Sequence, residues 1–501
     1  MKNRTTLAIA TMFLSLALPA AAQLPAYHAN LMGISDGRTN LQLEHIAGLN
    51  RWGQVIGTYG GGLSGGTHAV LWTPASANDG SGNAIDNTSN MFSLELSPGM
   101  PAGTANTFAT SLNDRGQIVG QAFTPGKGDG NQLQSWMWKP KTLNSNQGIL
   151  HGSVGTNTAF ALFTIPGADP TAQYNQVLNN KGSIGAHGEF YRAMLWNPTK
   201  PNATSGAWTY DPNNGGGAAA INDSGQYAGS SCSNATWNGP YLHNGPLPLV
   251  VTDILTSPLW EAPNPNECVG SVGGMNASGD LAISAVSSSV HAIHAYLYKK
   301  GKATDLSPAV GNGFTGEAFS INNHDQVVGH VDSDTRRAIL FQGSQVLDLN
   351  QLNDSTNGLL LKEAIAINDA GQILCQGVYP GANASVLLTP NALVINPVSV
   401  STGILQQNGS TYTQTITVTN LGTATIPGPI SVALDGLNAK VTLTNAAGTT
   451  FYTGPGSVYA NVSNSDLAAG ATTSSFTLTF SNPKLVAIKF KGRVLGTSAP
   501  R

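Results

Sequence analysis

One short pattern occurs seven times in this chain, and it limits the possible fold more than any other feature. Its last copy reads Ala366-Ile367-Asn368-Asp369-Ala370-Gly371-Gln372-Ile373-Leu374, with Asn after an apolar residue and Gly three positions later. The Asn residues of the seven copies are Asn50, Asn113, Asn179, Asn222, Asn276, Asn322 and Asn368. Their spacings are 63, 66, 43, 54, 46 and 46 residues, so the shortest units have the length of propeller blades.

Each copy predicts a β-hairpin. The side chain of Asn or Asp can cap a tight turn, and Gly can adopt the positive φ that reverses the chain. Only the sixth copy lacks this Gly and has Asp325 in its place. Further strands are expected downstream, because segments ending in an aromatic residue, such as Thr67 to Trp72 and Arg337 to Phe341, follow most copies. Segments such as Val346 to Leu349 then provide a fourth strand.

The combined pattern resembles the HAF-type extracellular repeat family of exported bacterial proteins. The resemblance rests on apolar-Asn-x-x-Gly-Gln, then His-Ala-apolar-Leu-aromatic as in Thr67 to Trp72, then Gly and Asp-Leu, over residues 46 to 388. Only His68 and His294 keep the His, and Ser385 to Leu388 lack the aromatic residue. The resemblance implies an exported, propeller-like protein without a defined reaction.

The sequence predicts an all-β chain with a seven-bladed β-propeller in residues 23–390. We expect residues Tyr27 to Met32 to supply the fourth strand of the seventh blade, because closure would remove two exposed strand edges. The alternative is a disordered N-terminal tail. A six-bladed ring is the alternative if the third unit, with Gly185 where other copies have an apolar residue, is not a full blade.

Residues 391–501 lack the repeat and predict an immunoglobulin-like β-sandwich. Alternating segments such as Tyr412 to Thr419 and Ser475 to Phe480 are separated by frequent turns. The segment also resembles sandwich modules appended to exported bacterial proteins, through Thr417 to Asn420 and Phe480 to Pro483.

The N-terminus predicts export. Lys2 and Arg4 precede an apolar stretch, and Ala20-Ala21-Ala22 offers a cleavage site, so residues 1–22 are interpreted as a signal peptide. The alternative is an uncleaved N-terminal anchor. We expect an extracellular or cell-surface location, with the periplasm as the alternative, and no membrane span in the mature chain.

The composition argues against nucleic acid as a partner. Charged residues make up 10% of the chain, the formal net charge is −3, and no run of basic residues is present. The three cysteines are Cys232, Cys268 and Cys375. Cys232 and Cys268 are the candidate disulfide, whereas Cys375 occupies the position of Gly57 and Gly120 and is interpreted as a buried thiol.

No catalytic group or metal site is predicted. The Asn and Asp side chains of the turns could bind Ca²⁺, but turn capping explains them better. His68 and His294 lie in separate units, so we interpret each as a packed or surface residue. No carboxylate pair and no Ser-His-Asp arrangement stands out. No cofactor is expected.

Four tryptophans outside the predicted strands are the ligand-binding candidates, because exposed Trp is favoured in binding sites: Trp52, Trp208, Trp237 and Trp260. By contrast, Trp72, Trp138 and Trp196 end predicted third strands and are assigned to the core. The favoured function is an exported, non-catalytic, monomeric binding protein for an extracellular polysaccharide or protein. The alternative is a propeller glycoside hydrolase or lyase.

Overall fold

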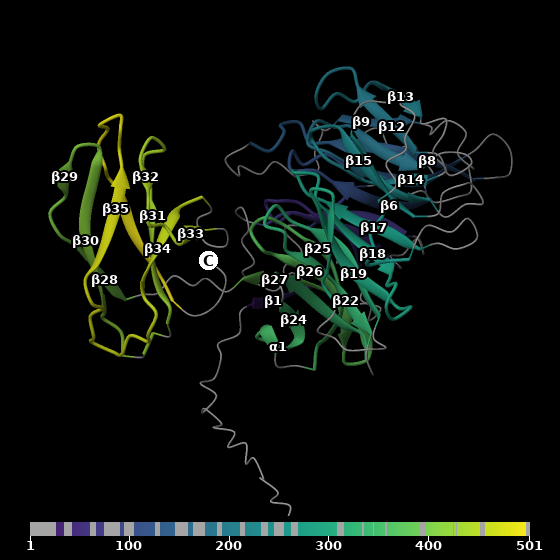
Figure 1. The fold of residues 1–501 in the computed structure, drawn as a ribbon. Coiled ribbons are helices and arrows are strands. Elements are labelled where there is room, and N and C mark those ends of the chain that lie inside the picture. The colour runs from purple at the N-terminus through teal and green to yellow at the C-terminus, as the bar shows by residue number, and fades with distance from the viewer. Residues whose placement is uncertain are drawn as a thin grey trace, which may run out of the picture.

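The protein is described by a computed structural model (Figure 1). It describes residues 27–34, 43–60, 67–74, 91–94, 105–125, 131–145, 159–163, 176–187, 193–210, 216–231, 239–244, 255–261, 269–307, 315–332, 335–343, 345–355, 358–390, 397–423, 425–426, 428–450 and 456–496. The predicted signal peptide therefore lies outside the described residues.

The described chain is all-β apart from the short helix α1 (Leu349–Leu352), and its strands form small antiparallel sheets. The first three repeats form β2 (His45–Leu49), β3 (Val55–Gly60), β4 (Thr67–Trp72) and β5 (Met91–Ser93); β6 (Ala105–Leu112), β7 (Ile118–Pro125), β8 (Asn131–Lys139) and β9 (Ala159–Phe163); and β10 (Val177–Leu178), β11 (Ile184–His187), β12 (Ala193–Pro198) and β13 (Gly206–Tyr210). Each of these three sheets has its strands in sequence order. The third repeat is thus a full four-stranded sheet, as the count of seven units requires.

The next three repeats have the same order of strands. They are β14 (Gly216–Ile221), β15 (Gln226–Ser231) and β16 (Pro240–Asn244); β17 (Gly270–Met275), β18 (Leu281–Val286), β19 (Ile293–Lys299) and β20 (Lys302–Asp305); and β21 (Thr315–Ile321), β22 (Val327–Asp332), β23 (Arg337–Gln342) and β24 (Gln345–Asp348). The fourth repeat has three strands within the described residues.

The seventh sheet joins the two ends of the repeat region. It contains β25 (Leu360–Ile367), β26 (Ile373–Tyr379) and β27 (Ala382–Pro390), and its outer strand is β1 (Tyr27–Ile34) from the N-terminus. Tyr27 pairs with Pro390 and Leu31 with Val386 in antiparallel register. The expected pairing of the N-terminal strand with the last repeat is confirmed, and the disordered tail is wrong for these residues.

The first strands of the seven sheets contact one another in a closed cycle: β2 with β6, β6 with β10, β10 with β14, β14 with β17, β17 with β21, β21 with β25, and β25 with β2. Apolar side chains fill the spaces between successive sheets. Ala282 and Ala295 of the fifth repeat, for example, pack in one cluster with Ile339 and Phe341 of the sixth. Trp72, Trp138 and Trp196 are buried, which confirms their assignment to the core.

The seven turns have the backbone conformation that the pattern predicts. Gly53, Gly116, Gly182, Gly225, Gly279 and Gly371 have φ between 76° and 84°. Asp325, which replaces Gly in the sixth copy, also has a positive φ of 59°. The turn geometry therefore persists where its glycine is lost.

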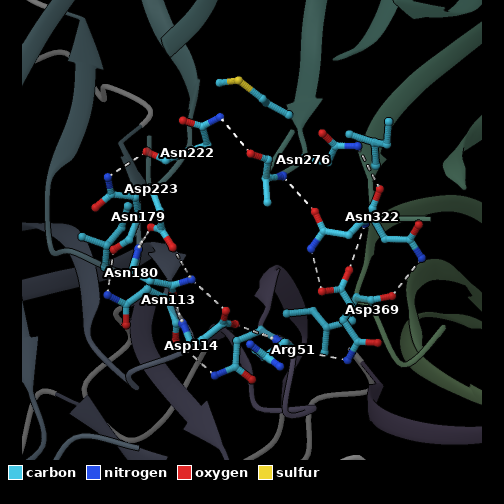
Figure 2. A pocket seen from close by; sticks show the side chains of 18 of the residues that line it. Arg51, Asn113, Asp114, Asn179, Asn180, Asn222, Asp223, Asn276, Asn322 and Asp369 are labelled. Carbon is cyan, nitrogen blue, oxygen red and sulfur yellow. Dashed lines mark hydrogen bonds between the residues drawn. The ribbon is translucent and has the colours of Figure 1, made fainter. Parts of the chain in front are cut away.

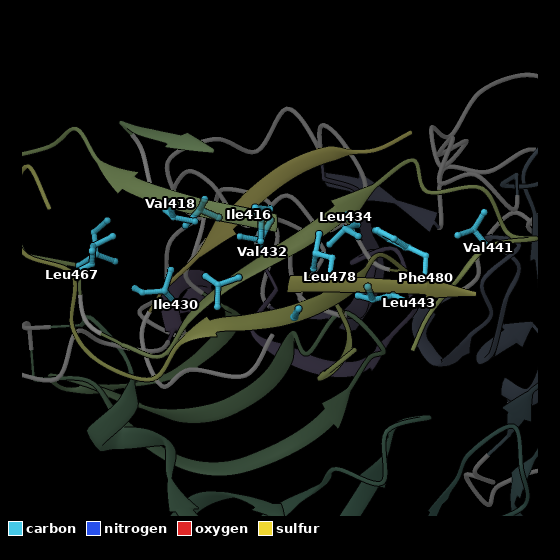
Figure 3. Close-up of a cluster of buried hydrophobic side chains, with 14 residues drawn as sticks. Ile416, Val418, Ile430, Val432, Leu434, Val441, Leu443, Leu467, Leu478 and Phe480 are labelled. Atoms are coloured by element: carbon cyan, nitrogen blue, oxygen red, sulfur yellow. The ribbon is translucent and has the colours of Figure 1, made fainter. Parts of the chain in front are cut away.

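Residues 398–495 form two sheets that share one core. One contains β28 (Val398–Thr402), β29 (Gln406–Asn408), β30 (Thr411–Asn420), β32 (Thr442–Leu443) and β35 (Phe476–Ser481). The other contains β31 (Ile430–Asp435), β33 (Gly448–Thr449), β34 (Val458–Ser463) and β36 (Lys491–Leu495). Figure 3 shows Val418 and Leu478 of the first sheet and Val432 of the second, which belong to the same buried cluster.

Candidate functional site

The seven turns share one geometry, which comes from the Asn side chain as well as from Gly. In the last repeat, Oδ1 of Asn368 accepts hydrogen bonds from the main-chain N–H groups of Ala370 and Gln372, both at 3.0 Å. Its Nδ2 donates to Oε1 of Gln372 at 3.0 Å. Equivalent contacts to main-chain N–H groups occur in all seven turns. The prediction that Asn caps the turn is confirmed.

The same Asn side chains connect neighbouring repeats. Nδ2 of Asn50 donates to the main-chain oxygen of Asn113 at 3.1 Å, and Nδ2 of Asn113 donates to that of Asn179 at 2.9 Å. The other contacts join Asn179 to Asn222, Asn222 to Ala277, Asn276 to Asn322, Asn322 to Asn368, and Asn368 to Asn50. Figure 2 shows Asn113, Asn179, Asn222, Asn276 and Asn322 of this set in the lining of one pocket. We call this set of contacts the inner ring.

The Gln residue four positions after Asn completes the turn, and sequence analysis did not assign it a role. Gln54, Gln117, Gln226, Gln326 and Gln372 each accept a hydrogen bond from their Asn. In the fifth repeat Asp280 takes this place, at 3.3 Å from Nδ2 of Asn276. The recurrence of Gln in the sequence pattern was the available signal.

A second set of contacts, the outer ring, involves the residue after each Asn. Oδ1 of Asp114 accepts from the main-chain N–H of Arg51 at 2.9 Å. In the same way, Oδ1 of Asn180 accepts a hydrogen bond from the main-chain N–H of Asp114 at 2.7 Å. Oδ1 of Asp223 accepts one from the main-chain N–H of Asn180, also at 2.7 Å. Later in the sequence, Oδ1 of Asn323 accepts a hydrogen bond from the main-chain N–H of Ala277 at 2.8 Å. Oδ1 of Asp369 accepts one from the main-chain N–H of Asn323 at 2.9 Å. Each outer-ring acceptor thus belongs to the repeat that follows its donor.

The outer ring is interrupted where the side chain cannot accept such a bond. The side chain of Ala277 contains no atom that could accept a hydrogen bond from the main-chain N–H of Asp223. The guanidinium of Arg51 likewise cannot accept one from the main-chain N–H of Asp369. The guanidinium carbon of Arg51 instead lies 4.4 Å from the centre of the Trp52 ring. The two interruptions make this otherwise repetitive surface asymmetric.

The two rings surround a pocket of about 230 Å³. All seven turns line this pocket. Each turn contributes its Asn and the residues directly before and after that Asn. Three carboxylates lie here, and each accepts two hydrogen bonds. Oδ2 of Asp114 and of Asp223 accept from Nδ2 of Asn180, and Oδ2 of Asp369 accepts from Nδ2 of Asn323. Their oxygen atoms are therefore used to connect repeats.

Burial raises the pKa of Asp114 above its ordinary value. The main-chain N–H of Arg51, the Asn180 amide and the Arg51 charge oppose this shift in pKa, while the Asp369 charge adds to it. The pocket combines this carboxylate with Arg51 and with amide groups, a set suited to hydrogen bonding of a polar ligand. Within the described residues, no group of three His, Cys, Asp or Glu side chains could hold a metal ion.

The tryptophan candidates are placed differently from one another. Trp52 lies in the first turn but is only 9% exposed, and its Nε1 donates to the main-chain oxygen of Asp114 at 3.1 Å. Trp260 is 2% exposed and packs against Tyr296 and Tyr298. The expected exposure of these two rings is wrong, because each ring fills a space beside a neighbouring strand or turn.

The remaining candidates have separate outcomes. Trp208 is half-buried in β13 rather than in a loop, where it pairs with Trp196, and Trp237 lies outside the described residues. The candidate disulfide between Cys232 and Cys268 also lies outside the described residues. Cys375 is a buried free thiol, as predicted, and burial raises its pKa.

His68 and His294 are confirmed as packed residues. His68 is 7% exposed and lies beside Tyr59, with ring centres 4.9 Å apart. Nδ1 of His294 contacts Oδ2 of Asp305 within its own sheet at 2.9 Å.

Comparison with protein-family models found no match, and comparison with curated proteins found none either. No helix among the described residues is long and apolar enough to cross a membrane.

Proposed function

We propose that the seven sheets are the blades of a seven-bladed β-propeller of the HAF-type repeat family, spanning residues 23–390. The closed cycle of first strands and the pairing of β1 with β27 support this architecture. We further propose that residues 391–501 form an immunoglobulin-like module. Two antiparallel sheets with a common core are what such a module requires.

We infer that the protein is an exported, non-catalytic binding protein for an extracellular polysaccharide or protein. The observation that carries this inference is the use of the pocket carboxylates. Asp114, Asp223 and Asp369 each accept two hydrogen bonds from the preceding or following repeat. A glycosidase needs one carboxyl group to give up a proton and another to act as base or nucleophile. Carboxylates that hold the ring together are poorly suited to those roles.

The binding surface is proposed at the seven turns, beside the described residues that follow β8. Asn144, in the segment after β8, connects that segment to the pocket. Its Nδ2 donates to Oε1 of Gln54 at 2.7 Å and to the main-chain oxygen of Asp114 at 3.2 Å. The pocket is thus contacted by a residue from outside the turn pattern.

The experiment is a glycan array probed with purified mature protein, followed by an assay for product release on every glycan bound. We expect binding without product. Arg51→Ala should weaken binding, because Arg51 lines the pocket and interrupts the outer ring. Lys440→Ala is the control, since Lys440 is exposed in residues 391–501. Hydrolysis or eliminative cleavage of a bound glycan would favour the propeller enzyme instead.

A further inference from the structure

The two sheets of residues 398–495 leave a groove on one side of their shared core. β28 is the outer strand of one sheet and β36 is the outer strand of the other. Among the described residues, no strand pairs with the remaining edge of either. The two strands approach closely at Gly492, where an added Cβ would lie 3.0 Å from Cγ1 of Val400. The groove therefore runs between two strand edges.

The groove has the size and character of a binding site. Its volume is about 850 Å³, within the range of roughly 300–1,000 Å³ that ligand sites occupy. Its apolar lining consists of Val398, Val400, Ile488, Phe490 and Val494. The first four are only partly buried and pack against the core of the two sheets. Apolar groups of a partner could complete their burial.

The charged lining of the groove is mostly basic, with Lys489, Lys491 and Arg493 beside one acidic residue, Asp435. Arg493 is held by Asp435 through two hydrogen bonds of 2.7 Å, and the guanidinium lowers the pKa of the Asp435 carboxyl. Lys489 and Lys491 are exposed, and neither forms a salt bridge with another described residue. The Lys491 charge acts on Asp435, whose pKa it helps to lower, but Asp435 forms its salt bridge with Arg493. Two ammonium groups therefore remain at the rim for a partner.

The charge of the whole C-terminal segment agrees with that of the rim. Residues 391–501 contain six Lys and Arg residues and two Asp and Glu residues, a formal charge of +4. Residues 23–390 contain 15 basic and 24 acidic residues, a formal charge of −9. The basic character thus belongs to this segment and favours an acidic partner.

We propose that this groove binds an extended acidic peptide segment of another protein as an added β-strand. Side chains alternate between the two faces of a strand, so apolar residues would enter the groove while acidic residues would reach Lys489 and Lys491. The unpaired strand edges would supply main-chain hydrogen bonds, which is how strand addition achieves affinity. This site is separate from the one proposed on the repeats and does not depend on it.

An apolar lining and two strand edges favour a peptide over an acidic polysaccharide. A polysaccharide would place hydroxyl groups against Val398, Val400 and Ile488 without polar partners there, at a cost in desolvation. It would also leave the main-chain groups of β28 and β36 unused. The lysines alone do not distinguish the two, so the experiment includes both.

The test uses the full mature protein and a fluorescent peptide that alternates valine and glutamate, with binding followed by anisotropy. We expect saturable binding that becomes about tenfold weaker in Lys489→Glu/Lys491→Glu, because two attractive contacts become repulsive. Lys440→Glu/Lys484→Glu is the matched control. It changes the net charge equally at exposed lysines outside the groove and should bind normally.

Two further probes separate strand addition from attraction between charges. The same peptide with alternate main-chain nitrogens methylated should bind about tenfold more weakly, since it cannot donate the required hydrogen bonds. Polygalacturonate should not compete at equal charge concentration. The proposal is overturned if the peptide does not bind, if methylation has no effect, or if polygalacturonate binds in its place through the same lysines.

Discussion

The side-chain amide of Asn368 donates a hydrogen bond to the main-chain oxygen of Asn50 at 3.0 Å, although the two residues are 318 positions apart. This contact joins the last turn to the first and closes the inner ring. A single residue type therefore performs two tasks. It holds its own hairpin in shape and attaches that hairpin to the next repeat.

Asn368→Ala should destabilise the repeat region by about 1–3 kcal/mol, the usual cost of leaving buried hydrogen-bonding groups without partners. The substitution removes the acceptor for Ala370 and Gln372 and the donor to Asn50. Urea unfolding followed by tryptophan fluorescence measures the change. Asn383→Ala is the control, because Asn383 is exposed on β27 of the same sheet. Equal stability of the two variants would contradict a structural role for the ring.

Removal of residues up to Ile34 should strongly destabilise the repeats. Met32 and Ile34 of β1 are 0% and 6% exposed, and burial of two such side chains contributes about 3–6 kcal/mol. The deletion also exposes the edge of β27, which favours association between molecules. We expect a lower melting temperature and oligomers in sedimentation velocity. A chain beginning at Tyr27 keeps the strand and serves as the control. A stable monomer without β1 would show that closure is dispensable.

Ala277→Asn should stabilise the protein by about 0.5–1.5 kcal/mol, the net value of a hydrogen bond. Asn180 and Asn323 occupy the equivalent position, and each accepts from the main-chain N–H of the preceding repeat. Asn at residue 277 could accept from Asp223 in the same way and fill one interruption. Ser278→Asn, one residue away in the same turn, is the control. An unchanged denaturation midpoint for Ala277→Asn would argue against this account of the outer ring.

Much of the local structure follows from the sequence because the turn chemistry is local. Asn, Gly and an apolar pair define the hairpin, and their recurrence predicts seven similar sheets. The pairing of β1 with β27 was predictable from the missing fourth strand of the last repeat. Turn capping was likewise predictable from the short reach of the Asn side chain.

The contacts between repeats were not predictable in the same way, because they depend on how separate hairpins are placed. Nothing in the sequence shows that Asp114 accepts a hydrogen bond from Arg51, 63 residues earlier. The prediction that Trp52 is exposed was wrong for a related reason. A turn residue is exposed in an isolated hairpin, but here the neighbouring turn covers it. The groove between β28 and β36 also depends on how two sheets pack.

Asp435→Asn should reduce stability at neutral pH, with an effect that disappears in acid. Arg493 lowers the pKa of Asp435 in the folded state. The ionised carboxylate therefore stabilises the fold above its unfolded pKa of about 3.9, and this contribution is lost as pH falls through the lower folded value. Urea midpoints of the wild type and variant, measured from neutral pH downward, should begin to converge at about pH 4 and meet below the folded pKa of Asp435. A difference between the two midpoints that does not depend on pH would contradict a role for the ion pair. In an Arg493→Gln background, Asp435→Asn should change the midpoint much less.

The number of cysteines that react with a thiol reagent should increase in steps, from the native protein to the unfolded protein and then to the unfolded, reduced protein. Cys375 is fully buried, and burial raises the pKa of its thiol, so little reactive thiolate forms in the folded protein. We expect no reaction in the native state and one reactive thiol after unfolding without reductant, if Cys232 and Cys268 form the predicted disulfide. Reduction should then release two more. Cys375→Ser should abolish the single thiol of the unfolded, unreduced protein. Three reactive thiols before reduction would show that Cys232 and Cys268 are not joined.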